Sequence, residues 1–147
     1  MENKKIVEDL KVLLASVFSF RIKTQFYHWN VTGPNFSEYH RLFGEIYSAA
    51  DSDIDDIAEH IRALGAWAPG GFQRFKELSQ IEEETTIPNA LEMISRTLSD
   101  VTKIHGIMMG LTKDAEEAGQ RGLVNFLEGL IDKNEKLQWM LRSFKGQ

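Results

Sequence analysis

The chain has 147 residues, of which 42% are hydrophobic, and its 17 Lys and Arg against 22 Asp and Glu give a formal charge of −5. These values are typical of one globular domain over residues 1–147, and the absence of cysteine excludes disulfides, thiolate zinc sites and iron–sulfur clusters. The longest apolar stretch, Val12–Phe20, is too short to cross a bilayer and no apolar leader precedes it, so we expect a cytoplasmic protein without a membrane segment.

The first half of the chain carries two long helical patterns. Residues 4–29 have apolar side chains at steps of three and four, which predicts a helix with one apolar face. After a loop at residues 31–34, the same spacing runs from Phe36 to Leu64, and Gly65 ends it. The second predicted helix is therefore roughly 30 residues long, well above the average for globular proteins.

The second half of the chain repeats this arrangement after a long connection. Residues 66–71 have the composition of a turn, and residues 72–78 have room for one short helix. A third long helix is predicted to begin near Pro88 and to end before Gly119, and a fourth covers residues 123–144. No segment alternates as a strand does. We predict an all-α, ferritin-like four-helix bundle whose crossover contains a short extra helix.

Metal-ligand side chains lie near the two ends of the first predicted hairpin. His28, near the end of the first helix, can meet His40, near the start of the second, across the tight loop. Asp55 and Glu59 lie one turn apart on the second helix, on nearly the same stripe as His40. At about 1.5 Å of rise per residue, however, His40 and Asp55 are roughly 22 Å apart, too far to share a metal ion. One chain therefore offers two half-sites.

A two-fold axis near Ser48 joins the half-sites by setting His28 and His40 of one subunit against Asp55 and Glu59 of its mate. Two imidazoles and two carboxylates suit first-row divalent ions, and these residue types do not choose iron over zinc or manganese. A single His or carboxylate on a helix is ordinarily structural, so the prediction depends on the joint fit of all four residues.

Other metal arrangements find less support in the sequence. His60 and His105 have no partner at ligand spacing along their helices, and we expect structural roles for them. The Glu-x-x-His motif, which intrachain di-iron bundles need twice, does not occur in the chain. The predicted metal site is therefore the one shared between subunits.

Several segments of the chain resemble a known family. They are YHWNVTGPNF at residues 27–36, followed by His40, and DDIAEHIRALG at residues 55–65. Residues 135–144 are similar to the last helix of the same family, so nearly the whole chain is covered. The family is Dps, the miniferritins named as DNA-binding proteins from starved cells.

The resemblance implies a homo-oligomer, a hollow dodecamer built from ferritin-like bundles. It implies protection against oxidative stress: oxidation of Fe(II) to Fe(III) at two-fold interfaces, with hydrogen peroxide preferred to oxygen, and storage of ferric mineral in the shell. The implied ferroxidase ligands are His28 and His40 of one subunit and Asp55 and Glu59 of its neighbour. Trp29 matches a tryptophan that donates an electron, although packing at the interface explains it equally well.

The chain departs from the family at two positions. Gly44 stands where most relatives have an Asp that helps to hold a second iron ion. Glu45 points about 100° away around the helix, so it is not a simple replacement, and we expect a weak second metal position. Asn125 stands where the iron-entry pore of the family has an Asp, so attraction of cations to that pore is expected to be weaker.

DNA binding is predicted to be weak or absent despite the family name. The termini offer only Lys4, Lys5, Arg142 and Lys145, and the net charge is negative. The alternative function is a structural or nucleoid-associated shell in which Gly44 has weakened the ferroxidase chemistry.

Overall fold

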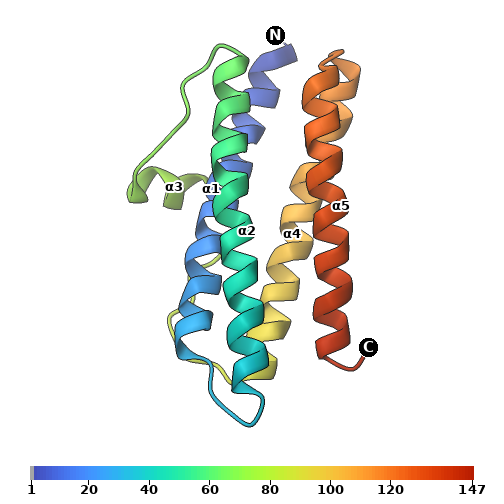
Figure 1. Cartoon of the computed structure of the whole chain (residues 1–147). Coiled ribbons are helices and arrows are strands. Elements are labelled where there is room, and N and C mark those ends of the chain that lie inside the picture. The colour runs from blue at the N-terminus through green and yellow to red at the C-terminus, as the bar shows by residue number, and fades with distance from the viewer. Residues whose placement is uncertain (1) are drawn as a thin grey trace.

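The computed structural model describes residues 2–147, and within this range it contains five helices and no strand. The helices are α1 (Glu2–Asn30), α2 (Phe36–Ala63), α3 (Phe72–Leu78), α4 (Ala90–Glu117) and α5 (Arg121–Phe144) (Figure 1). The four long helices form one bundle, and the short α3 lies beside it in the connection between α2 and α4. The predicted four-helix bundle with a short extra helix in its crossover is confirmed.

The order of the helices gives two antiparallel hairpins. In Figure 1 the chain runs down α1 and up α2, then up α4 and down α5. Residues 64–89 return along the length of the bundle, which is why α2 and α4 run parallel. Gly65 allows the chain to leave α2, because its φ of 89° is in the left-handed region and the N–H of Ala66 can then donate to the carbonyl of Ile61 at 3.3 Å.

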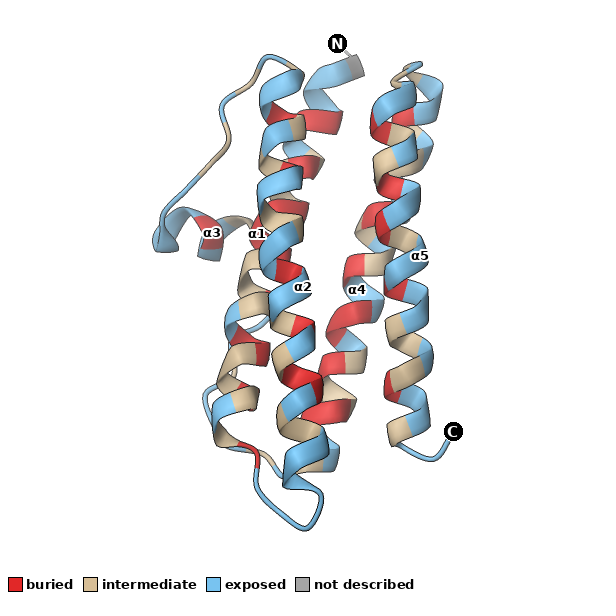
Figure 2. Cartoon of the chain, viewed as in Figure 1, coloured by how far each residue is buried: buried red, intermediate tan, exposed pale blue. Residues whose placement is uncertain are grey.

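Apolar side chains from all four long helices fill the bundle interior (Figure 2). Burying one large aliphatic or aromatic side chain is worth roughly 1.5–3 kcal/mol relative to leaving it exposed, so these contacts hold the hairpins together. The largest fully buried side chains are Ile6, Leu10, Leu13, Leu14, Tyr27, Phe43, Ile57, Ile61, Met93, Ile94, Leu111 and Leu127.

Buried polar contacts fix the crossover to the bundle. The backbone N–H of Gln80 donates to the hydroxyl of Ser16 at 3.0 Å. Lys23 of α1 is buried, with its Nζ 2.8 Å from Oδ2 of Asp100 in α4, and it also donates to the carbonyl of Glu82 at 3.0 Å. Burial raises the pKa of Asp100, and the ammonium group of Lys23 opposes this shift. These contacts hold the crossover against α1, and the Lys23–Asp100 ion pair joins α1 to α4.

The third long helix, α4, is predicted to begin near Pro88. In the structure it begins at Ala90. Asn89 is the N-cap, and its Oδ1 accepts a hydrogen bond from the N–H of Glu92 at 2.9 Å. An Asn side chain satisfies a free N–H group of the first turn, so the helix begins at Ala90. Over residues 2–147, no helix combines the length and apolar character needed to span a bilayer.

Candidate metal centre

The α1–α2 hairpin brings His28 and His40 into direct contact. His28 lies in the last turn of α1, and His40 lies near the start of α2. The two rings are stacked, with centroids 3.8 Å apart and planes 15° from parallel. The ring of Tyr47 lies 5.4 Å from that of His28, and the ring of Phe36 lies 5.0 Å from that of His40. Both imidazoles are therefore half-buried among aromatic side chains.

Each of these histidines is hydrogen-bonded to the backbone of the other. Nδ1 of His28 lies 2.6 Å from the carbonyl oxygen of His40, and Nδ1 of His40 lies 2.8 Å from the carbonyl oxygen of His28. A carbonyl oxygen only accepts, so both Nδ1 atoms carry a hydrogen, and Nε2 of each neutral imidazole keeps its lone pair. Metal-ligating histidines are commonly oriented by such a bond from the other ring nitrogen. Nε2 of both rings is therefore left without a backbone partner and can act as a ligand.

The two candidate carboxylates lie elsewhere on α2. Asp55 and Glu59 are one turn apart, and both are exposed. The rise of the helix separates Asp55 from His40 by roughly 22 Å. In the part of the chain that the structure describes, no three or more His, Asp or Glu side chains lie close enough together to hold a metal ion. One chain thus keeps the four predicted ligands in two separate half-sites.

Trp29, the residue after His28, is exposed. Its side chain is 64% accessible, and Ile22 and Phe36 on the same hairpin are 42% and 43% accessible. Packing in the core of this chain does not explain why these three positions carry large apolar side chains, because all three are exposed. Large apolar side chains on a surface are typical of regions that contact another molecule.

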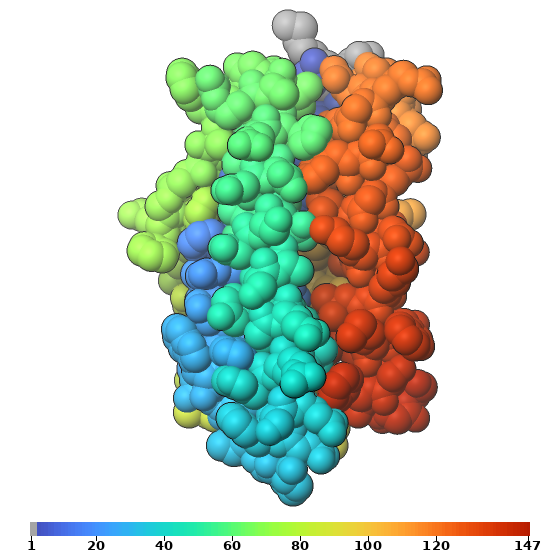
Figure 3. Space-filling model, viewed as in Figure 1, coloured from blue at the N-terminus to red at the C-terminus, as the bar shows by residue number. Residues whose placement is uncertain are grey.

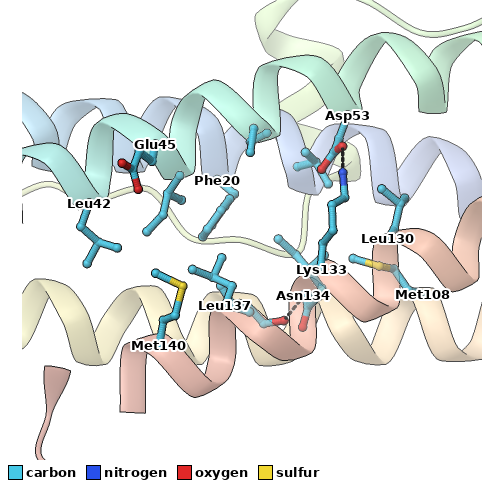
Figure 4. Close-up of a pocket in the computed structure, with 16 residues that line it drawn as sticks. Phe20, Leu42, Glu45, Asp53, Met108, Leu130, Lys133, Asn134, Leu137 and Met140 are labelled. Atoms are coloured by element: carbon cyan, nitrogen blue, oxygen red, sulfur yellow. Dashed lines mark hydrogen bonds and ion pairs between the residues drawn. The ribbon is translucent and has the colours of Figure 1, made fainter. Parts of the chain in front are cut away.

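A largely apolar pocket of about 210 Å³ opens on the surface of the bundle (Figure 4). It lies between α2 and α5, which are side by side on the face shown in Figure 3. Three of the polar groups along it are engaged with each other or with the backbone. Nζ of Lys133 is 2.8 Å from Oδ1 of Asp53, and the amide of Asn134 donates to the carbonyl of Val101 at 3.0 Å. Burial raises the pKa of Asp53, and Lys133 opposes this shift.

Known proteins resemble this chain in both sequence and structure. Residues 7–147 match the ferritin-like domain family. A DNA protection during starvation protein from Brevibacillus brevis is 32% identical over 84% of this chain and 83% of its own length. The crystal structure of a Dps protein from Bacillus brevis has a TM-score of 0.94 at 29% identity, and the match covers 97% of this chain and 96% of that one. The chain belongs to the Dps family.

Another Dps structure supports the same assignment. The Dps protein from Vibrio cholerae O1, described as a member of a broad superfamily of ferritin-like diiron-carboxylate proteins, has a TM-score of 0.94 at 29% identity. That match covers 97% of this chain and 90% of the Vibrio cholerae chain. The agreement therefore extends over nearly the whole bundle.

The structure shows the surroundings of Gly44 and Asn125, the two positions at which we expect departures from the Dps family. Gly44 lies directly against the ring of His28. Glu45, the next residue, lines the pocket between α2 and α5 together with Met140 (Figure 4). Asn125 lines a surface hollow at the turn between α4 and α5, and Glu116 and Glu128 line the same hollow. Acidic side chains therefore remain near Asn125.

The structure gives His105 a carboxylate partner on another helix. Nε2 of His105 in α4 lies 2.8 Å from Oε2 of Glu135 in α5, and this contact joins the two helices. The partner is 30 residues away on another helix, where spacing along one helix gives no signal. His60 stacks on Phe126 with ring centroids 4.2 Å apart. Only knowledge of how the helices pack could have found either contact.

Proposed function

We propose that this chain forms a hollow homo-dodecamer that oxidises Fe(II) to Fe(III) with hydrogen peroxide and stores ferric mineral inside. The observation that supports the chemistry is the reciprocal hydrogen bonding of His28 and His40, which leaves Nε2 of both rings available to a metal ion at one end of α2. Membership of the Dps family, which contains the ferritin-like diiron-carboxylate protein of Vibrio cholerae, supports iron as the substrate.

Each proposed site combines His28 and His40 of one subunit with Asp55 and Glu59 of the partner subunit. A two-fold axis across the middle of α2 sets the α2 helices of the two subunits antiparallel. The start of each helix then lies beside the end of the other, and each contact occurs twice. Imidazole nitrogen suits Fe(II), and the harder carboxylate oxygens stabilise Fe(III) after oxidation. Zinc and manganese suit the same ligands, and we expect them to compete with iron.

The proposed reaction balances with two iron ions for each peroxide. One hydrogen peroxide accepts two electrons and two protons and becomes two water molecules, while two Fe(II) ions become Fe(III). A single Fe(II) that gave peroxide only one electron would instead release a hydroxyl radical. We propose that Trp29, adjacent to His28 in the chain, supplies the second electron when only one Fe(II) is bound.

Iron oxidation after anaerobic loading tests the function. Ferric absorbance is followed after peroxide addition for the wild type, His28→Ala and Asp55→Asn. We expect both variants to oxidise iron no faster than it oxidises in free solution. His105→Ala and Asp56→Asn, which change the same residue types outside the proposed site, should keep the wild-type rate. A wild-type shell that does not accelerate oxidation would point to the structural or nucleoid-associated alternative.

Mixed shells test whether two subunits share each site. In shells co-assembled from equal amounts of His28→Ala and Asp55→Asn chains, some sites take His28 from one variant and Asp55 from the other. Random pairing leaves about a quarter of the sites intact, whereas a shell of either variant alone has none. We expect about a quarter of the wild-type activity to return, and no recovery would contradict shared sites. Native mass spectrometry of the same samples counts the subunits.

A further inference from the structure

The pocket between α2 and α5 is deeper than a groove between two helices. Its wall includes Val17 of α1 and Val101 and Met108 of α4, in addition to side chains of α2 and α5. These three residues are buried, so the pocket reaches the core of the bundle. Natural protein interiors contain few voids larger than a water molecule, because the atoms around a void lose packing contacts. Packing of the bundle therefore does not explain an opening of about 210 Å³.

Small side chains on α2 leave this space open. Ala49 and Ala50 are consecutive residues near the middle of α2, and both line the pocket. Ala50 is buried and Ala49 is exposed, so Ala50 belongs to the inner wall and Ala49 to the mouth. An apolar cavity of about 150 Å³ is enough to hold benzene. The pocket, at about 210 Å³, therefore has room for an aromatic ring with a short side chain or for an aliphatic chain of similar size.

The charges along the pocket are uneven (Figure 4). Lys133 and Asp53 form an ion pair near one end, with Nζ 2.8 Å from Oδ1, and balance each other. Glu45 lies toward the other end, and none of the ion pairs within residues 2–147 includes it. Asp53 follows Glu45 by eight residues on α2, so the two ends are roughly 12 Å apart. One carboxylate beside an apolar wall thus remains unbalanced.

The surroundings of Glu45 do not reverse this charge. A groove continues from the pocket past Glu45, and Glu38 and Arg41 of α2 line it together with Phe144 of α5. Glu38 and Arg41 carry opposite charges, so the groove adds no net charge. An organic anion in the pocket would therefore lie beside Glu45 without a free cation to bind, whereas an organic cation would neutralise Glu45.

We propose that this pocket binds a small organic ammonium ion, with its apolar ring or chain between α2 and α5 and its ammonium group beside Glu45. Burial of the apolar body supplies most of the affinity. The carboxylate supplies the selectivity for a cation, and because Glu45 is exposed this contribution is modest. The site includes none of the four proposed metal ligands, so it stands independently of the proposed function.

Equilibrium dialysis of the intact shell against three matched probes tests the site. The probes 2-phenylethylammonium, 2-phenylethanol and 3-phenylpropionate share a ring and a short chain but differ in charge. We expect one ammonium ion per subunit, with a dissociation constant on the order of 1 mM, which is within reach of a ligand of about nine non-hydrogen atoms. The alcohol should bind about two- to five-fold more weakly, since it lacks the ion pair. The anion should bind most weakly of the three.

Two matched pairs of variants test the position of the probe. Ala49→Phe places a ring at the mouth of the pocket and should abolish binding, whereas Ala63→Phe, at an exposed position near the end of α2, should not. Glu45→Gln keeps the shape of the pocket but removes the charge, so the ammonium ion and the alcohol should bind equally. Glu128→Gln, at an exposed position of α5 outside this pocket, should keep the preference for the ammonium ion.

A wild-type shell that shows no saturable binding of the ammonium ion up to about 10 mM would overturn the proposal. Equal or tighter binding of the alcohol or the anion would overturn the assignment to a cation, and a preference that survives Glu45→Gln would refute the role of this carboxylate. A crystal structure of the wild-type shell with 2-phenylethylammonium locates the probe even if Ala49→Phe fails to fold. A probe found only outside the pocket would likewise overturn the proposal.

Discussion

The phenolic hydroxyl of Tyr27 donates a hydrogen bond to Oε1 of Glu84 at 2.6 Å, which ties the residue before His28 to the crossover. Nη1 of Arg96 in α4 donates to both oxygens of the same carboxylate, at 2.8 and 3.0 Å. The side chain of Glu84 is only 5% exposed. Burial and the bond to Glu84 raise the pKa of Tyr27, so its hydroxyl remains a donor. The last turns of α1 are thus tied to the crossover and to α4.

The acid stability of the protein should depend on Glu84. Burial acts to raise the pKa of this carboxyl, but hydrogen bonds from Tyr27, Arg96 and Thr86 outweigh it and lower the pKa from 4.5 to about 2. Because the pKa is lower in the folded state, Glu84 stabilises the fold fully above pH 4.5 and loses this effect as the pH falls toward 2. The shift corresponds to about 3 kcal/mol at neutral pH.

Replacing Glu84 with Gln should therefore lower the free energy of unfolding at pH 7 by about 2–3 kcal/mol and flatten its pH dependence between pH 4.5 and 2. Denaturant titrations at one fixed subunit concentration measure both effects, since assembly makes stability depend on concentration. Glu83→Gln, at the exposed neighbouring position, is the control. A Glu84→Gln protein with the pH profile of the wild type would contradict the assignment.

Lys23→Met should destabilise the fold strongly. Lys23 and Asp100 are 8% and 4% exposed, so the substitution leaves a buried carboxylate without its partner, at a cost of about 3–5 kcal/mol. The double variant Lys23→Met, Asp100→Leu removes both charges and should recover most of the loss. Denaturant unfolding measures both, with Lys76→Met at an exposed position of α3 as the control. A double variant no more stable than Lys23→Met would show that lost packing, not the unpaired charge, is responsible.

Trp29→Phe should increase the escape of hydroxyl radicals during iron oxidation. Phenylalanine is a much poorer electron donor than tryptophan, so a peroxide reduced by a single Fe(II) would more often release a radical. Spin trapping, normalised to the iron oxidised, measures the escape. Trp67→Phe is the control, because Trp67 is also exposed, at 79% against 64% for Trp29. An unchanged radical yield together with weakened assembly would assign Trp29 to interface packing.

DNA should not be retained by the shell at about 0.15 M salt. Nζ of Lys5 lies 2.7 Å from carboxylate oxygens of both Asp9 and Asp114, so one of the few N-terminal cations is already neutralised within the chain. The formal charge of −5 is repeated in every subunit. Gel retardation at increasing salt measures the interaction, and Lys5→Gln should leave the result unchanged. A shifted band that persists at this salt concentration would contradict the prediction.

Local patterns were enough to predict the architecture of this chain. Apolar spacing located all four long helices, because a helix that packs on one side repeats every three to four residues, and the long connection left room for the short helix at residues 72–78. The start of α4 was predicted only approximately, near Pro88, and the side-chain bond of Asn89 fixes it at Ala90.

The candidate site was predictable in part. The contact of His28 with His40 follows from a tight loop between two helices. The space that Gly44 leaves for His28 could not be predicted from the loop, because it depends on how closely α1 approaches α2. From sequence alone, Gly44 looks like a lost ligand. In the structure it lies against the ring of His28, whose Nδ1 bonds to the carbonyl of His40.

The reciprocal bonds between His28 and His40 also bear on how a centre of this kind is emptied and refilled. Backbone carbonyls hold the two rings, so the ligands keep their places after a product ion leaves. The entropy of ordering these side chains is lost once, when the chain folds, and not again at each arrival of an ion. In the proposed site, refilling would therefore require no rearrangement of the histidine pair.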